Sequence, residues 1–307
     1  FSASDPSAVA TSISDALTDV GVKAGALAAV TVTSTNLVAG GNNSIFEVSF
    51  KAGEWSGDVV KRSIDATTGE LSAPVWAAQA LLDAKVANGT HKARTIYTYD
   101  TELTSTDKIK PFLYDELSEA EKEYFALQAI QGLSQICEVG PTCLAAKTQV
   151  SASGEPLLNF IRGDSTNEGS PIDRATFYRQ RAHLLGDIAS SEAVYVQASP
   201  WNYADLQYGA FKTANADRAG QVYVGANDGM LHAFDAATGE EAWAYVPRIV
   251  MPSLYKLADK NYAAPDRHQF LVDATPVAGD IYDNHSQVKA WKTILVGGLN
   301  NGGRGYY

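Results

Sequence analysis

The two cysteines are the first residues of this sequence whose type and spacing could support chemistry. Cys137 and Cys143 stand six residues apart, with Gly140 and Pro141 between them, which is typical of a disulfide that closes a small loop. The alternatives are two inert buried thiols or half of a metal site, but the neighbouring sequence offers no further His or Cys ligands. We therefore expect a disulfide, which would place the protein outside the reducing cytosol.

Four aspartates on or beside predicted strands are the second candidate group. They are Asp187, Asp228, Asp273 and Asp280. Such carboxylates can surround a metal ion, but Asp228 is explained by a turn, and the last two flank TPVAG, where they can cap strand ends. The five histidines show no metal-motif spacing, and His232 is expected to be packed within a strand. We therefore assign no catalytic, cofactor-binding or metal-binding residue and predict no enzyme.

Arg162, Gly163 and Asp164 spell the tripeptide that integrins recognise. Recognition would require that the tripeptide be displayed at the tip of an exposed loop. Here it lies within NFIRGDSTNEG, behind an apolar lead-in, and short motifs often match by chance. We therefore favour a structural role, in which Arg162 and Asp164 form local hydrogen bonds and hold a crossing segment in place.

Three aromatic residues occur close together in SPWNYADLQYGAF, a predicted loop between two strands. They are Trp201, Tyr203 and Tyr208. Aromatic side chains on a loop can form a contact surface, because they supply a large area at a low entropic cost. They can equally fill the top of a domain as a lid. The sequence leaves both interpretations open.

The overall composition limits the class of protein. The 307 residues include 35 acidic and 24 basic side chains, for a net charge of −11, and 45% are hydrophobic. The hydrophobic content excludes a disordered chain. The acidity argues against nucleic acid or an anionic lipid surface as the main partner. Nothing approaches eighteen consecutive apolar residues, so no membrane-spanning segment is predicted.

The candidate residues must be positioned by helices and strands, and the patterns of both alternate along the chain. The predicted helices cover residues 5–21, 76–88 and 118–136. The predicted strands lie within residues 28–64 and 95–99 and fill most of the chain after Gly186. Ser118 and Glu121 fit a capping box. Residues 174–185 fit either a short helix or an extended crossing segment.

The clearest pattern is an internal repeat. DATTGE at 65–70 and DAATGE at 235–240 each follow a strand and precede a tryptophan, Trp76 or Trp243. Strand–turn–strand–DxxTGE–Trp is the repeat unit of quinoprotein-type β-propellers, whose blades take about 40–45 residues. In the second copy, the Asp-Gly pair at 228–229 predicts a two-residue hairpin turn. Three or four units are visible, which is too few to close a ring.

The predicted fold class is therefore mainly β: a partial quinoprotein-like β-propeller with helical and loop insertions and an incomplete ring. Residues 1–27 are predicted to be a linker helix that enters the propeller region. Residues 28–307 are predicted to be the first part of a modified propeller, with a helical insertion around 115–150. Because the sequence ends inside a predicted hairpin, we expect it to be part of a longer protein.

Several segments together carry a family resemblance. They are WSGDVV, DATTGEL, VWAAQALLD, LLNFIRGDSTNEG, HLLGDIASSEAVYV, VYVGANDGMLHAFDAATGEEAWAYVPRIV, HQFLVDATPVAGDIY and WKTILVGGLNNGGRGYY. In order and spacing, this series resembles the PilC/PilY family of type IV pilus biogenesis factors and tip-associated adhesins. The resemblance runs from about Phe1 to Tyr307 and is most specific from Asn159 onward.

The resemblance implies a secreted protein at the pilus tip, on the cell surface and associated with the outer membrane. It implies action in pilus assembly, retraction and adhesion through protein–protein contacts. The implied partners are minor pilins and a host-cell or abiotic surface ligand. Some members carry a calcium-binding loop, but the series D-x-[DN]-x-[DN]-G is missing here, so that site lies beyond Tyr307 or is absent. We expect no cofactor in this segment.

Three alternatives come from other classes of protein. They are a quinone-dependent propeller oxidoreductase, an outer-membrane assembly scaffold and a structural filament subunit. The oxidoreductase is disfavoured because Cys137 and Cys143 are not adjacent, as the cysteines of such enzymes typically are. A propeller fold alone does not imply that activity.

Overall fold

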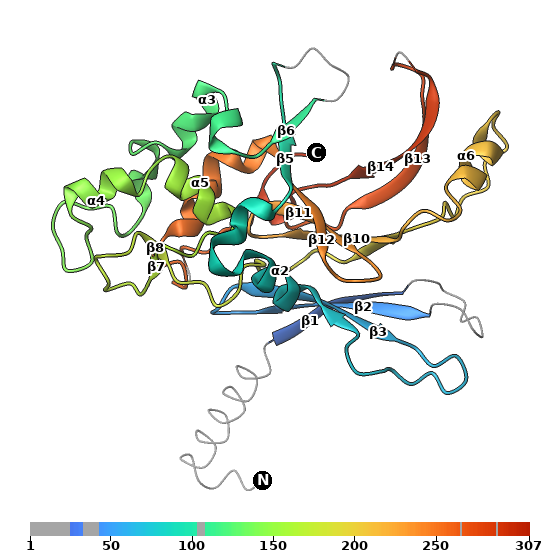
Figure 1. The fold of residues 1–307 in the computed structure, drawn as a ribbon, viewed down its shortest axis with the longest axis horizontal. Helices are drawn as coiled ribbons and strands as arrows, with labels where there is room; N and C mark the ends of the chain where they lie inside the picture. The colour runs from blue at the N-terminus through green and yellow to red at the C-terminus, as the bar shows by residue number, and fades with distance from the viewer. Residues whose placement is uncertain (1–24, 33–42, 103–107, 265, 287) are drawn as a thin grey trace, which may run out of the picture.

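The computed structural model describes residues 25–32, 43–102, 108–264, 266–286 and 288–307 (Figure 1). The strands are β1 (Gly25–Val32), β2 (Ser44–Lys51), β3 (Ser56–Ser63), β4 (Trp76–Ala77), β5 (Ile96–Tyr99), β6 (Ile109–Pro111), β7 (Glu168–Gly169), β8 (Tyr178–Arg179), β9 (Val194–Val196), β10 (Gln221–Ala226), β11 (Met230–Asp235), β12 (Glu241–Val246), β13 (Val277–Asp283) and β14 (Ala290–Val296). The α-helices are α2 (Ala78–Val86), α3 (Glu119–Lys122), α4 (Ala146–Ser151), α5 (Glu155–Arg162) and α6 (Tyr208–Ala214). The 3₁₀ helices are η1 (Ala87–Ala93), η2 (Tyr114–Glu116), η3 (Glu123–Phe125), η4 (Ala129–Gly132), η5 (Arg248–Ala258) and η6 (Asn300–Gly302). The helix predicted over 5–21, and the predicted linker up to residue 24, lie outside the described residues.

Two of the described sheets have the arrangement of propeller blades. β1 to β4 form an antiparallel sheet in chain order, and β9 to β12 repeat this arrangement. In the second blade, β5 pairs in parallel with β12, and β6 pairs with β5. β13 and β14 form a hairpin, beyond which Gly298 bridges Tyr306. The described sheets form no closed ring, as expected for a partial propeller.

The two DxxTGE corners have the same internal hydrogen bonds. Oδ1 of Asp65 accepts from the backbone N–H groups two and three residues later, at 2.7 and 2.9 Å, and Asp235 does so at 2.9 Å for both. Each aspartate carbonyl also accepts from the glycine four residues later, at 2.8 Å. These glycines, Gly69 and Gly239, have φ values of 74° and 78°. The sequence repeat is therefore also a structural repeat.

The hairpin between β10 and β11 differs from the prediction. Ala226 pairs with Met230, so the loop has three residues, and of these only Gly229 has a positive φ, at 90°. The predicted two-residue turn is therefore wrong. The extra residue is Asn227, whose N–H donates to the carbonyl of Asp187 at 2.9 Å instead of to the opposite strand. A three-residue loop with glycine last is another common hairpin connection.

Trp76 of β4 joins the first blade to the second. A Cβ atom at Gly239 would come within 2.5 Å of the Trp76 ring, so the indole lies directly on this glycine. The indole N–H donates to the carbonyl of Ala236 at 3.3 Å, and Lys61 Nζ donates to the same carbonyl at 2.8 Å. Apolar side chains around this contact form a buried core, which includes Phe46, Val48, Val59, Leu185, Val222, Val224 and Phe234.

Gly239→Ala is expected to destabilise the chain more than Gly69→Ala, although both glycines have nearly the same φ. A left-handed backbone costs alanine roughly 1–2 kcal/mol at either position, and a Cβ at Gly69 meets nothing within 4 Å. At Gly239 the Cβ also overlaps Trp76, and such overpacking costs roughly 1–3 kcal/mol more. Urea unfolding of both variants measures the difference, and equal losses of stability would contradict this account of the interblade contact.

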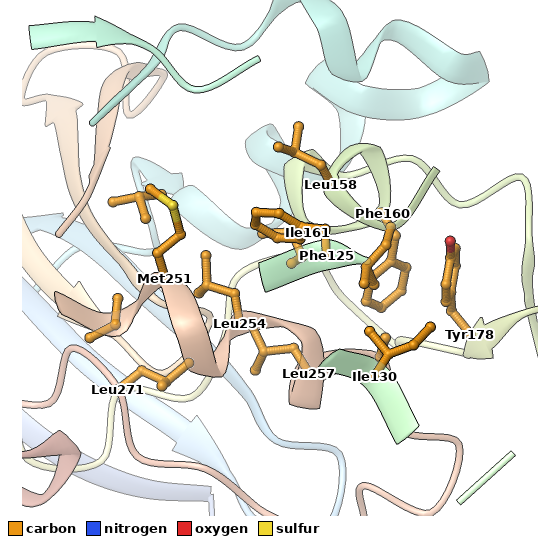
Figure 2. Packing of buried hydrophobic residues seen from close by; sticks show 14 of the residues in the cluster. Phe125, Ile130, Leu158, Phe160, Ile161, Tyr178, Met251, Leu254, Leu257 and Leu271 are labelled. Atoms are coloured by element: carbon orange, nitrogen blue, oxygen red, sulfur yellow. The ribbon is translucent and has the colours of Figure 1, made fainter. Parts of the chain in front are cut away.

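A second core lies in the helical insertion between the first two blades, on the side of Figure 1 away from α6. Figure 2 shows side chains from distant segments converging there. They include Phe125, Ile130, Leu158, Phe160, Tyr178, Leu254 and Leu257. The insertion therefore packs as one unit, with η5 as the element contributed from beyond the second blade.

The single helix predicted over 118–136 is wrong. The capping box of Ser118 and Glu121 is present, but α3 ends at Lys122 and is followed by η3 and η4. The buried residues that follow stand three apart, at Ile130, Leu133 and Ile136, and the backbone N–H groups of Leu133 and Ile136 each donate to the carbonyl three residues before. That spacing suits 3₁₀ turns, with three residues per turn, and not a continuous α-helix.

The other expected elements fall close to their predicted places. β1, β2, β3 and β5 cover the strands expected within 28–64 and 95–99, and α2 covers most of 76–88. Residues 174–185 are an extended crossing segment that includes β8. After Gly186, α6 and η5 interrupt the predominantly β part of the chain.

Candidate functional site

A buried network of charges runs through the second blade. His232 of β11 and Glu241 of β12 are buried, and Arg94, just before β5, is buried beside them. Arg94 binds the Glu241 carboxylate twice, through Nε at 2.8 Å and Nη2 at 2.6 Å. His232 Nδ1 lies 2.9 Å from Glu241 Oε1, and its Nε2 lies 3.1 Å from Asp228 Oδ2. Positive and negative groups therefore alternate along the network.

The two carboxylates hold His232 in its charged form. Burial alone would lower the pKa of His232, but Asp228 and Glu241 outweigh burial and raise this pKa to about 9. Burial would likewise raise the pKa of Glu241, yet Arg94 and His232 hold it far below its usual range. At neutral pH the imidazolium therefore donates from both ring nitrogens, one to each carboxylate.

A second polar cluster lies beside this network. His268 Nε2 is 2.9 Å from Asp187 Oδ1, and Asn227 Nδ2 donates to Asp187 Oδ2 at 2.7 Å. Asp273 accepts from Asn301 Nδ2 at 2.9 Å. These contacts tie the β10–β11 loop to the segments before β9 and before β13, so the cluster fixes the loops at one end of the blades.

The four aspartates considered for metal or cofactor chemistry are all engaged by protein donors. Besides the contacts above, Asp280 accepts from the Tyr208 hydroxyl at 2.8 Å and from Thr293 Oγ1 at 2.7 Å. Among the described residues, no group of three or more His, Cys, Asp or Glu side chains is arranged to hold a metal ion. The contacts observed for these carboxylates are those of loop and strand positioning.

The tripeptide at 162–164 ends α5 and turns away from solvent. The Arg162 side chain is only 2% exposed and donates from Nη2 to the carbonyl of Arg94 at 3.0 Å. Gly163 forms the left-handed C-cap, and Asp164 accepts from the Thr166 N–H at 3.0 Å. These local contacts favour the structural role, and in this conformation the guanidinium is not displayed to a partner.

The aromatic loop residues are divided between surface and interior. Tyr208 is 1% exposed, so the interpretation of this residue as a contact surface is wrong. Its ring supports the others by an edge contact to Trp291, with centroids 4.7 Å apart. Tyr203 is 40% exposed and stacks on both Trp201 and Trp291, at 6.5 and 5.7 Å. Tyr208 therefore packs inward, as expected of a lid, whereas Tyr203 remains on an aromatic surface.

Cys137 and Cys143 are joined as a disulfide, with their Cα atoms 5.2 Å apart. The bridge closes the expected small loop, and Arg174 Nε donates to the carbonyl of Cys143 at 2.8 Å. The loop is thereby attached to the extended crossing segment.

Three important residues escaped the sequence analysis: Arg94, Glu241 and His268. For Glu241, the sequence did contain a signal: a charged residue in a predicted strand directly after the corner motif, in DAATGEEAW. Nothing local indicates its partner, because Arg94 lies 147 residues earlier in the chain. No helix in the described part of the chain has the length and apolarity needed to cross a membrane.

The repeated blades, the matching corners and the interblade tryptophan define a β-propeller protein, of which this chain contains a part with helical insertions. Residues 185–307 match the family model described as the PilY1 beta-propeller domain. The chain belongs to the PilY1 family of type IV pilus factors. No solved structure matches the chain significantly.

Curated relatives cover most of the chain. A type IV pilus biogenesis factor PilY1 homolog of Xylella fastidiosa is 34% identical over 269 residues, which are 85% of this chain and 18% of that protein. The type IV pilus biogenesis factor PilY1 of Pseudomonas aeruginosa is 31% identical over 320 residues, covering 100% of this chain and 25% of that protein. The chain thus spans a quarter or less of the length of these relatives.

Proposed function

We propose that this chain is part of a non-enzymatic protein at the tip of the type IV pilus, exposed on the cell surface. Its role is to support pilus assembly, retraction and adhesion through protein–protein contacts, with minor pilins as partners. The relatives' description as pilus biogenesis factors supports this role. The engagement of the buried carboxylates by protein donors also favours a scaffold over a quinone-dependent enzyme.

One surface carries the proposal. We call it the aromatic tip, and it consists of Trp201, Tyr203, Leu206, Tyr282 and Trp291. It lies where the loop before α6 meets the β13–β14 hairpin, at the far end of the molecule from α4 (Figure 1). Leu206 is 85% exposed and Tyr282 is 42% exposed. Grouped aromatic and aliphatic side chains of this kind are typical of protein contact sites.

The side chains of the aromatic tip are held by contacts with one another and with the strands beneath them, which suits a binding surface. Trp291 Nε1 donates to the carbonyl of Leu206 at 3.0 Å, so the loop and the hairpin hold each other. Tyr208 packs beneath them with its hydroxyl bonded to Asp280. Side chains held in this way lose little conformational entropy when a partner binds.

The double variant Trp201→Ala/Tyr203→Ala, made in the full-length protein, is expected to weaken association with minor pilins at least tenfold. Aromatic anchors commonly carry this much of a protein interface, since a tenfold change corresponds to about 1.4 kcal/mol. Quantitative co-purification and surface piliation measure the effect. Tyr306→Ala is the matched control, because Tyr306 is an 85% exposed tyrosine outside the aromatic tip. Equal pilin recovery from both variants would refute the proposed contact.

A further inference from the structure

A cavity of about 460 Å³ lies where three distant segments meet. These are the β2–β3 turn, the stretch 170–182, which includes β8, and the loop after η5. Its volume falls within the range of small-ligand sites, which is roughly 300–1,000 Å³. The charged and aromatic residues that line it are Glu54, Trp55, Arg179, Arg181, Lys260 and Tyr262. None of them belongs to the aromatic tip.

Arg179 is fixed in the cavity wall with part of its guanidinium unused. Its Nε donates to the carbonyl of Leu257 at 2.7 Å, and the group lies 4.1 Å from the centre of the Tyr262 ring. No residue in the described part of the chain accepts a hydrogen bond from Nη1 or Nη2 or forms an ion pair with them. Burial lowers the pKa of Arg179 to about 10, so the side chain remains charged at neutral pH.

Lys260 adds a second positive charge that forms no ion pair among the described residues, although the Asp173 carboxylate is near enough to act on its pKa. Its Nζ donates to Thr176 Oγ1 at 3.0 Å and to the backbone carbonyl of Asp173, both of which are neutral acceptors. Its side chain is buried, with 5% of the residue exposed. The ammonium is thus held at the cavity wall, and its charge is not cancelled by an ion pair among the described residues.

The remaining charges around the cavity are already paired. Arg181 Nε donates to Glu168 Oε1 at 2.7 Å. Glu54 is the lining carboxylate, and it forms an ion pair with Lys51. Arg179 and Lys260 therefore leave this cavity positive, although the whole chain has a net charge of −11.

Trp55 forms part of the cavity wall in a strained conformation. Its φ of 53° lies in the left-handed region, which bulky residues seldom adopt. The ring stacks on His268 with centroids 3.8 Å apart. Backbone strain of this kind is concentrated at functional sites, because the surrounding structure must hold it. The tryptophan is thus an independent observation at the same cavity.

We propose that this cavity binds a carboxylate group of a ligand, with Nη1 and Nη2 of Arg179 as its paired donors and Lys260 as a supporting charge. The planar guanidinium matches a carboxylate with two parallel hydrogen bonds, which a lysine cannot reproduce. An acidic sugar and an acidic amino-acid side chain both supply this chemistry. The experiment distinguishes these two sources.

Isothermal titration of the full-length protein with five probes, one of which is inorganic phosphate, tests the assignment. Glucuronate and N-acetylglutamate amide carry the carboxylate, and glucose and N-acetylglutamine amide are their neutral counterparts. We expect at least one carboxylate probe to bind and its neutral counterpart not to bind. The tighter carboxylate probe identifies the source. Equal binding of charged and neutral probes, no binding of either carboxylate, or tighter binding of inorganic phosphate would overturn the proposal.

Arg179→Lys is expected to lower the affinity for the carboxylate probe at least tenfold, because lysine keeps the positive charge but lacks the two parallel N–H donors of the guanidinium. Arg304→Lys is the matched control, since Arg304 is exposed and does not line the cavity. An unchanged affinity in Arg179→Lys would overturn the role of Arg179. The comparison of charged and neutral probes uses the unaltered protein, so the test stands even if a variant does not fold.

Discussion

Glu241→Gln is expected to lower the free energy of unfolding by about 3–5 kcal/mol, which is the cost of breaking a buried ion pair by removing one partner. The substitution leaves Arg94 buried without its carboxylate and removes one of the two groups that charge His232. Glutamine has nearly the same shape as glutamate, so changes in packing contribute little to the loss of stability. Chemical denaturation monitored by tryptophan fluorescence measures the effect.

Glu240→Gln is the matched control for this prediction. Glu240 precedes Glu241 in the same corner, but it is exposed and forms no ion pair with a described residue. Surface substitutions of this kind usually change stability by less than about 0.5 kcal/mol. A loss below 1 kcal/mol in Glu241→Gln would mean that the network contributes little to folding.

Raising the pH from about 6.5 to 9 is expected to destabilise the chain by roughly 3 kcal/mol through His232 alone. The folded pKa of this histidine, about 9, lies above its ordinary value of 6.5, so the folded chain binds the proton more tightly. The resulting stabilisation is fully present below pH 6.5 and is lost as the pH rises through 9. Urea unfolding at half-unit pH intervals measures this decline.

His232→Gln should remove most of this pH dependence, although it also lowers stability at neutral pH. His285→Gln provides the comparison, because His285 is exposed and should leave the decline in place. A wild-type stability that stays flat between pH 6.5 and 9 would show that His232 is not held as a cation between Asp228 and Glu241.

Both predictions concern the buried charge network of the second blade. Asp228 lies in the β10–β11 loop, and its Oδ2 accepts from the Gly186 N–H at 3.2 Å, where the chain enters the second blade. The charge network therefore connects the blade interior with its entry segment. We expect its loss to loosen the second blade before it affects the aromatic tip, which is held by separate contacts.

The sequence by itself determined the features that depend on neighbours along the chain. The DxxTGE corners were predictable because Asp65 and Asp235 bond to residues only two to four positions later. The disulfide joins cysteines six residues apart, and the Ser118 capping box spans one helical turn. The repeat and the family motifs likewise indicated a partial propeller, which the family model and the sheets confirm.

Only the tertiary structure decided which distant groups meet. Arg94 and Glu241 are 147 residues apart, and Trp76 lies against a corner more than 150 residues later, so no local pattern encodes either contact. The same reason explains why the integrin-like tripeptide is turned inward, since Arg162 is bound to carbonyls of segments 50 and 68 residues away. Burial is a property of the packed chain and not of the motif, and it separates Tyr208, at the start of α6, from Tyr203 in the loop before it.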